Sequence, residues 1–219
     1  GENGSGKTTL MNMLSGIYFP DEGQIYIHDK PVTIASPKDA FDLGIGMIHQ
    51  HFKLVDVFTA VENIALSMDK GEKFDLRRVR DKARAICEKY QFALDLDQKV
   101  YEMSVSQKQT LEIVKVLFRG ADILILDEPT SGLDPVSRDE LVELFRAIVA
   151  DGQRSILFST HITSDLEKCA SHITFIKDGA IFHSSTVAEF MAAYADRGAT
   201  LEDIIVSVER RPLDENAII

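Results

Sequence analysis

The first eight residues have the composition and spacing of a phosphate-binding loop. The pattern G-x-x-x-x-G-K-[ST] is matched by Gly1-Glu2-Asn3-Gly4-Ser5-Gly6-Lys7-Thr8. The glycines let successive backbone N–H groups turn toward one anion, and the N-terminus of a following helix favours negative charge. Lys7 is spaced to reach the β- and γ-phosphates, and the Thr8 hydroxyl is spaced to bind Mg²⁺. A glycine-rich turn before a helix is the alternative interpretation.

Two carboxylates follow a strongly apolar run later in the chain. Residues 123–126 read Ile-Leu-Ile-Leu, which is typical of a parallel strand buried on both faces. Such a strand delivers its carboxyl end to the ligand-binding edge of a sheet. Asp127 is then suited to hold Mg²⁺ through water, and Glu128 to act as general base on the attacking water. A solvated acidic strand end is the alternative, but together with the phosphate loop the pair predicts nucleotide hydrolysis.

Strand and helix patterns alternate along the chain and predict a layered α/β fold. Strands are expected at 24–27, 45–48, 123–126, 155–158 and 173–176, with a hairpin turn at Asp178-Gly179 leading into 180–182. Helices are expected at 10–14, after Ser36, and at 77–94, 139–150 and 164–170, with further helix and irregular chain from about Thr186. Thr59 and Glu62 form a capping-box pattern inside a mostly helical stretch, which we interpret as an inserted helical subdomain.

Composition narrows the class of protein. The chain has 219 residues, 45% hydrophobic and 27% charged, with a net charge of -11. An acidic chain disfavours nucleic acid as a partner. The two cysteines, Cys87 and Cys169, have no metal-ligand spacing and fit a reducing compartment. No run of about 18 apolar residues is present, so a role at a membrane requires a partner.

Six motifs occur in one order, and with them the chain resembles the ATP-binding subunits of ABC transporters over nearly its whole length. They are the phosphate loop (1–8), Gln50 after the strand 45–48, the segment 103–107 (Met-Ser-Val-Ser-Gln), the strand end 127–130 (Asp-Glu-Pro-Thr), the segment 131–134 (Ser-Gly-Leu-Asp) and the segment 159–161 (Ser-Thr-His). The resemblance implies a P-loop NTPase core, with a mostly parallel sheet flanked by helices. It also implies an α-helical subdomain at about 52–120 within one domain spanning 1–219.

The resemblance also implies ATP and Mg²⁺ as ligands and a role for each motif. The residues implied to bind nucleotide are Gly1, Asn3, Gly4, Ser5, Gly6, Lys7, Thr8 and Thr9, with Ser104 and Asp134 acting across a subunit interface. The residues implied to hold Mg²⁺ are Thr8, Gln50 and Asp127. The residues implied to be catalytic are Glu128, His161 and Gln50, with His161 contacting the γ-phosphate. A lone histidine after a strand is more often structural, and its place after Ser159-Thr160 favours the functional role.

The implied partners are a second ATP-binding subunit, identical or different, and transmembrane permease subunits. Family ATPases pair head to tail around two ATP molecules, and residues near Gln50 and in 52–102 are implied to contact the membrane partner. The domain is therefore expected at the cytoplasmic face of a membrane, held there by its partners. A non-transport ABC ATPase and a weakly active regulatory module are the alternatives, although the chain has neither a cysteine cluster nor a long inserted coiled coil.

Three departures from the family pattern accompany the resemblance. The strands that usually precede the phosphate loop are not in the sequence, so we expect a fragment of a longer gene product with exposed neighbouring strands. Val105 and Ser106 stand where the signature usually has glycines, and Thr110 where arginine is common, which predicts reduced activity or one weak site in a heterodimer. Residues 38–66 resemble sugar and nucleoside importers, whereas 131–206 are closer to exporter ATPases.

Overall fold

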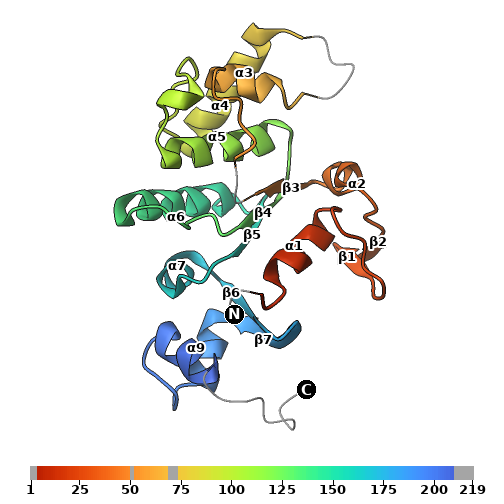
Figure 1. Ribbon diagram of the computed structural model, residues 1–219, viewed down its shortest axis with the longest axis vertical. Helices are drawn as coiled ribbons and strands as arrows, with labels where there is room; N and C mark the ends of the chain where they lie inside the picture. Colours follow the sequence, from red (N-terminus) through yellow and green to blue (C-terminus); the bar gives the residue numbers. More distant parts are fainter. Residues whose placement is uncertain (1–3, 50–51, 69–73, 210–219) are drawn as a thin grey trace.

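A parallel sheet of three strands lies at the centre of the described chain. The computed structural model describes residues 4–49, 52–68 and 74–209. Strands β3 (Ile45–Ile48), β4 (Ile123–Asp127) and β5 (Ser155–Ser159) lie side by side in the order β3-β4-β5, as Figure 1 shows. Their register pairs Ile45 with Ile123 and Asp127 with Ser159, so the polar residues that end β4 and β5 meet at one edge.

Two antiparallel hairpins flank this sheet. The predicted turn at Asp178-Gly179 is confirmed and joins β6 (His172–Lys177) to β7 (Ala180–Thr186), which runs longer than expected. The strand β1 (Ile25–Ile27) pairs with β2 (Lys30–Val32). We did not predict β2, because its three residues include Pro31 and carry no alternating apolar signal.

The helices lie mostly where the apolar periodicity predicted them. They are α1 (Lys7–Leu14), α2 (Pro37–Asp42), α3 (Ala60–Ala65), α4 (Leu76–Tyr90), the 3₁₀ turn η1 (Val100–Glu102), α5 (Val105–Phe118), α6 (Pro135–Val149), α7 (Thr163–Cys169), α8 (Val187–Ala193) and α9 (Leu201–Glu209). The Ser36 cap and the Thr59/Glu62 capping box are both confirmed.

Three helix boundaries differ from the prediction, each because of a local cap. Helix α1 begins at Lys7 rather than Leu10, directly after Gly6 in the left-handed region. Helix α6 begins at Pro135 rather than 139, because Asp134 caps it and proline suits the first turn. Helix α4 ends at Tyr90 rather than 94, because Gln91 adopts a φ of 58°.

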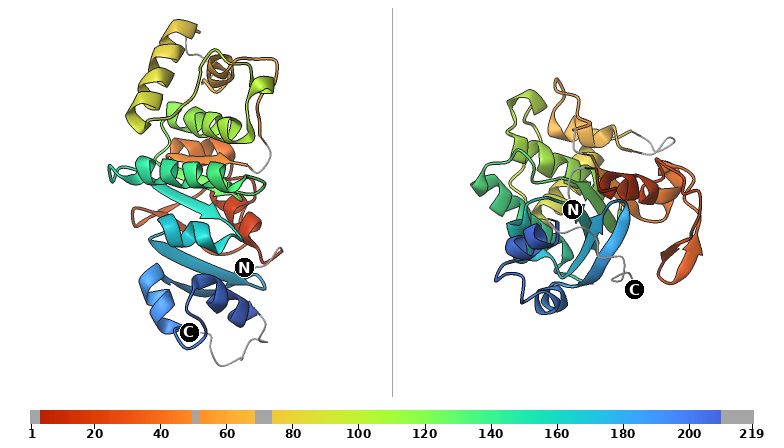
Figure 2. Two further views of the ribbon diagram at one scale, coloured as in Figure 1. Left: turned by 90° about the vertical axis from the view of Figure 1, so that its left-hand side faces the viewer. Right: turned by 60° about the horizontal axis from the view of Figure 1, so that its bottom comes forward.

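The helical segment and the sheet share one core. Between residues 52 and 122 the described residues form helices and loops and no strand, and Figures 1 and 2 place α3, α4 and α5 beyond the β3 edge of the sheet. One continuous cluster of buried side chains joins them, including Val61 from α3, Leu111 from α5, Leu124 from β4 and Phe145 from α6. The helical segment and the sheet therefore pack against each other through buried side chains.

A wide groove separates β5 from β6. No ladder joins these two strands in the described part of the chain, and the space between them measures about 860 Å³. Its walls include α1, the end of α6 and α9, together with apolar side chains that remain partly open, such as Leu157 (40% exposed) and Val206 (37% exposed). Two strand edges of the layered core therefore face each other without a ladder between them.

Candidate functional site

Ser159 fixes the two carboxylates at the end of β4. The Ser159 hydroxyl donates to Asp127 Oδ1 at 2.6 Å and accepts from the Glu128 backbone N–H at 3.0 Å. The Asp127↔Ser159 pairing of β4 with β5 creates this contact, and both residues are buried. Glu128 has a φ of 49°, a strained value for a residue with a Cβ, and such strain concentrates at functional sites. In the sequence, Ser159 is visible only as part of a motif, and no local pattern indicates this pair of hydrogen bonds.

His161 contacts the predicted general base. Its Nδ1 lies 2.8 Å from Oε2 of Glu128, with the histidine exposed and the glutamate side chain 14% exposed. A proton on Nδ1 makes the ring the donor and the carboxylate the acceptor. The structure therefore brings together Asp127, Glu128 and His161, which lie on two neighbouring strands and the loops that follow them.

The phosphate loop has the conformation that its glycines predict. Gly4 and Gly6 have φ values of 87° and 101°, a region that side chains with a Cβ rarely adopt. The Gly179 N–H donates to the Ser5 carbonyl at 3.1 Å, so the β6–β7 turn supports the loop. Ser5 Oγ is buried and has no hydrogen-bond partner among the described residues, whereas Thr8 and Thr9 are exposed. Gly1 and Asn3 lie outside the described residues.

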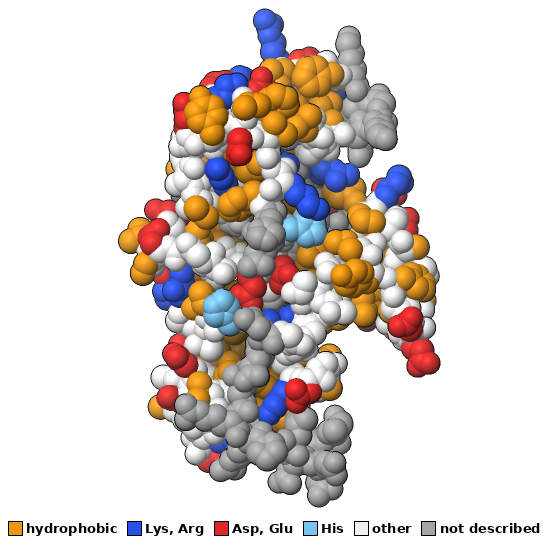
Figure 3. Space-filling view, in the orientation of Figure 1, with side chains coloured by type: hydrophobic (Ala, Val, Ile, Leu, Met, Phe, Trp, Pro, Cys, Tyr) orange, Lys and Arg blue, Asp and Glu red, His pale blue; other side chains and the backbone are white. Residues whose placement is uncertain are grey.

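The loop and the carboxylate edge lie close together. Lys7 lines the same groove as Ser159, Thr160 and His161, and α1 packs against β4. Figure 3 shows acidic side chains, a lysine or arginine and a histidine gathered in the middle of one face, over the region where β4 and β5 lie in Figure 1. A cation, backbone N–H donors and two acids are therefore concentrated at one edge of the sheet.

Ser104 lies apart from this cluster. It caps α5, accepting from the Gln107 backbone N–H at 3.2 Å, while its own N–H donates to Gln107 Oε1 at 2.9 Å. Ser104 is exposed and the Val105 side chain is 50% exposed, so the start of α5 faces outward. Helix α5 packs on α3, α4, α6 and β3, whereas the phosphate loop leads into α1.

Asp134 is held at the start of α6. One carboxylate oxygen accepts from the backbone N–H groups of Val136 and Ser137, and the other accepts from the Ser137 hydroxyl at 2.6 Å. These hydrogen bonds, led by that of the Ser137 side chain, lower the pKa of Asp134. Asp134 is thus a fixed negative charge on an exposed loop, and the described residues show no contact between it and the Asp127–His161 cluster.

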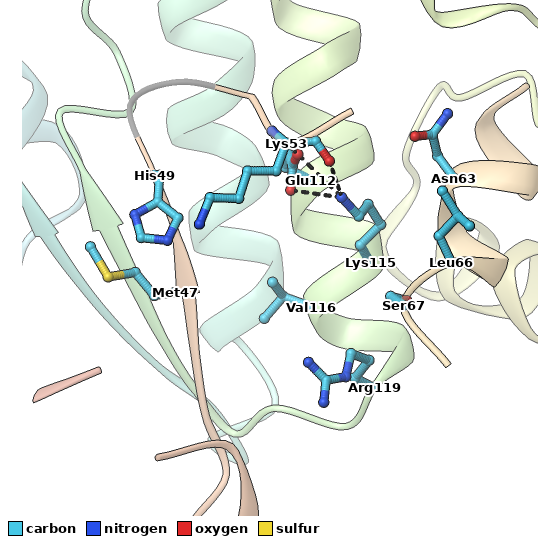
Figure 4. Close-up of a pocket in the computed structure, with 10 residues that line it drawn as sticks. All are labelled: Met47, His49, Lys53, Asn63, Leu66, Ser67, Glu112, Lys115, Val116 and Arg119. Atoms are coloured by element: carbon cyan, nitrogen blue, oxygen red, sulfur yellow. Dashed lines mark hydrogen bonds and ion pairs between the residues drawn. The ribbon is translucent and has the colours of Figure 1, made fainter. Parts of the chain in front are cut away.

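A second hollow lies on the other side of β3 and is lined by His49, the residue that precedes Gln50 in the sequence. Gln50 itself lies outside the described residues. The hollow measures about 300 Å³, and Figure 4 shows the side chains of β3, α3 and α5 around it. It is lined by Met47, His49, Lys53, Asn63, Leu66, Ser67, Glu112, Lys115, Val116 and Arg119.

Charge is unevenly distributed in this hollow. Lys115 Nζ lies 3.2 Å from both oxygens of Glu112 and donates to the Lys53 carbonyl at 3.0 Å. The lining of the hollow has a net charge of +2, from three positive side chains and one carboxylate: Lys53, Lys115, Arg119 and Glu112. The net charge of the whole chain is -11. Burial, followed by the charge of Lys53, lowers the pKa of His49, which favours its neutral form.

The fold and this site together define a P-loop nucleotide-binding domain. A parallel sheet delivers an acidic strand end beside a glycine-rich loop that opens a helix, as phosphate chemistry requires. Comparison with known proteins narrows the class further: the model of the ABC transporter family matches residues 1–131. This chain belongs to that family, as an ATP-binding domain.

Relatives with assigned roles support the same placement. The chain is 44% identical over 181 residues to the nucleoside import ATP-binding protein NupA of Lactococcus lactis, covering 82% of this chain and 36% of that protein. It is 42% identical over 181 residues to the guanosine import ATP-binding protein NupO of Bacillus subtilis, covering 82% and 35%. The chain therefore spans little more than a third of the length of these relatives.

Solved structures show the same fold. The chain is similar to cbiO1 of Clostridium perfringens, part of the ABC transporter complex cbiONQ, with a TM-score of 0.76 and 25% identity. That match covers 96% of this chain and 81% of the other. The ADP conformation of an ATP-binding cassette of an ABC transporter gives a TM-score of 0.75 at 24% identity, covering 93% and 84%. Both support the predicted P-loop core with its helical segment.

Proposed function

We propose that this domain binds and hydrolyses ATP to drive the import of a nucleoside or sugar through a separate membrane partner. The hydrolytic class follows from the family. The solute class is supported by the roles of the relatives, which include nucleoside import and guanosine import. A third relative is the ribose import protein RbsA of Hahella chejuensis, which is 38% identical over 192 residues, covering 86% of this chain and 38% of that protein.

The observation that carries the proposal is the clamp of Ser159 on Asp127 and Glu128. It holds the Asp127 carboxylate, which we assign to a metal ion, and the backbone of Glu128. The Glu128 side chain, whose Oε2 lies 2.8 Å from His161 Nδ1, is assigned to the attacking water. Phosphoryl transfer requires mainly positioning and charge neutralisation, and a fixed base provides the positioning. Glu128 accepts a proton from water, and His161 holds the Glu128 carboxylate before nucleotide arrives and turns to the γ-phosphate afterwards.

The residues present fit ATP and Mg²⁺. Ser5 Oγ is buried without a hydrogen-bond partner inside a loop of left-handed glycines, as expected where a phosphate oxygen completes the site. Gly1, Asn3, Gly4, Gly6 and Thr9 would surround the phosphates with Lys7. Thr8, Asp127 and Gln50 would hold Mg²⁺, which supplies charge neutralisation at the β- and γ-phosphates.

Two copies, or one copy and a related subunit, would complete each site. The outward-facing start of α5 presents Ser104 and a helix N-terminus, which suits the γ-phosphate of ATP held by another subunit. Asp134, fixed on its exposed loop, would link the two sites. Val105 and Ser106 narrow the approach of backbone to phosphate, so we propose slower turnover than a signature with two glycines permits.

The hollow beside β3 is the proposed contact with the membrane partner. It lies between the sheet and the helical segment, and the exposed Leu66 (60%) stands at its side. Its net positive charge suits a partner segment that carries a carboxylate, received by Lys53. Among the described residues, no helix is both long and apolar enough to cross a membrane. From the import roles of the relatives, we propose that the domain works at the cytoplasmic face, attached through this partner.

The first test is the sedimentation of Glu128→Gln with and without MgATP, together with its rate of ATP hydrolysis. We expect loss of turnover, retained ATP binding and, at a protein concentration too low for association without nucleotide, a dimer only when MgATP is present. Unchanged turnover would contradict the assignment of the base. A monomer that binds ATP would mean that Ser104 and its altered neighbours do not pair with an identical subunit, and that the second subunit differs.

The alternatives have less support. A chromosome-structure or repair ATPase carries a long coiled coil, and the longest helices among the described residues, α4 and α6, have 15 residues each. An inactive regulatory module does not need a general base, whereas Glu128, which we propose as the base, is held in place by Ser159. Measurable hydrolysis that Glu128→Gln abolishes would exclude the inactive module.

A further inference from the structure

An ion pair with a buried carboxylate joins the helices that follow two of the site segments. Arg138 Nη2 on α6 lies 3.0 Å from Oδ1 of Asp165 on α7 and 3.1 Å from the hydroxyl of Ser164. The Asp165 side chain is 1% exposed. Figure 1 shows α6 and α7 as neighbours beside the sheet, and α7 also packs on α9.

The pair lies one helical turn beyond each segment. Arg138 follows Asp134 by four residues, and Asp165 follows His161 by four residues. Asp134 caps the helix that carries Arg138, so any movement of Arg138 moves the cap. A displacement of the chain after His161 likewise moves Asp165. The pair therefore connects the segment that faces the γ-phosphate to the loop that faces the other subunit.

The pair has hydrogen-bonding capacity that it does not use. Arg138 Nε and Asp165 Oδ2 are both buried, and neither has a hydrogen-bond partner among the residues that the structure describes. An arginine fork can bind a carboxylate through two parallel hydrogen bonds, yet this pair makes one. Because buried polar atoms are rarely left unpaired, a small shift of α7 along α6 that engages the second bond gives a second favourable arrangement.

We propose that Arg138 and Asp165 are positioning residues that couple the two ATP sites of the dimer, by passing the state of the His161 segment to Asp134. The proposal rests on the proposed function, because it requires two ATP sites. Neither residue touches nucleotide. The pair switches between one and two hydrogen bonds as α7 responds to the γ-phosphate, and α6 carries the change to the interface.

The test distinguishes coupling between the two ATP sites from a role of the ion pair in stabilising the fold alone. In the double variant Arg138→Met/Asp165→Leu, apolar side chains of similar size replace the ion pair, a change that buried ion pairs often tolerate. We expect its melting temperature and its affinity for ATP to stay near those of the parent. The Hill coefficient of ATP hydrolysis, which can rise toward about 2 for two coupled sites, should fall to about 1.

Two further variants complete the experiment. Arg138→Lys keeps the positive charge but removes the forked guanidinium group, so it should also lower the Hill coefficient. This variant replaces the double variant in the test if the double variant does not fold. Asp139→Asn is the control, because Asp139 and Lys168 join the same two helices through an exposed ion pair. It should leave the Hill coefficient unchanged. A parental Hill coefficient in the folded double variant, or an equal loss in Asp139→Asn, would overturn the proposal, whereas failure of Glu128→Gln to dimerise concerns only the proposed function.

Discussion

At the scale of single residues, the hydroxyl of Ser159 supports both acids of the site. Ser159→Ala removes the hydrogen bond to Asp127 and the one from the Glu128 N–H. Hydrogen bonds to charged groups contribute about 1.5–3 kcal/mol, so we expect kcat to fall about 10- to 100-fold with a smaller change in ATP affinity. Steady-state kinetics and nucleotide titration measure the two effects. Ser184→Ala, at an exposed hydroxyl on β7, is the control, and an equal loss there would contradict the assignment.

The cysteines predict a pH dependence at alkaline pH. Burial raises the pKa of Cys87 and of Cys169 from 9.0 to about 11. The folded state therefore keeps these thiols protonated where the unfolded chain loses its protons, so stability present below pH 9.0 declines between pH 9.0 and about 11. Denaturant unfolding over this range, compared with Cys87→Ala/Cys169→Ala, should show a shallower decline in the variant.

The sequence predicted the identities of the site residues better than their contacts. Asp127 and Glu128 are recognisable because an apolar run ends in two acids beside a phosphate-loop pattern. The contact of His161 with Glu128 and the clamp by Ser159 depend on the register of β4 with β5, which no local pattern encodes. The roles of Gly1, Asn3 and Gln50 stay predictions, because these residues lie outside the described part of the chain.

At the scale of elements, β3 packs against α5 only because residue 46 has no side chain. A Cβ at Gly46 would lie 2.2 Å from Cγ1 of Val116 and 3.0 Å from Cβ of Ala121. Gly46→Ala should therefore destabilise the fold by about 1–3 kcal/mol in denaturant unfolding. Adding Val116→Ala removes the colliding methyl group, so the double variant should be more stable than the sum of the two single changes predicts. Strict additivity would contradict this packing.

Element types were predictable and element ends were not. Long apolar strands and capped helices were correctly placed, since each depends on local periodicity. Helices α1 and α6 begin earlier than predicted because Gly6 and Asp134 are their N-cap residues. We had assigned only the proposed functional roles to these two residues. The strand order β3-β4-β5 came only from the structure, because pairing between segments far apart in the chain leaves no local pattern.

At the scale of the whole molecule, the groove between β5 and β6 makes the 219-residue chain prone to self-association. Unpaired strand edges recruit other strands, and apolar side chains such as Leu157 line this groove. We expect concentration-dependent association in sedimentation without nucleotide, and less of it in Leu157→Lys. Val57→Lys changes an exposed apolar side chain outside the groove and should have little effect. Equal reductions in both variants would indicate a general effect of added charge instead.

The hollow beside β3 has a consequence for how the domain meets a membrane. Anionic lipid headgroups repel a chain whose net charge is -11. The chain is therefore repelled from the membrane in most of its orientations. The hollow, with its charge of +2 from three cations and one carboxylate, is drawn toward that surface. A domain that docks as proposed is therefore oriented by the electric field, with the hollow facing the membrane, before it makes contact. Because salt screens the field, raising its concentration should lower the association rate more than it raises the dissociation rate.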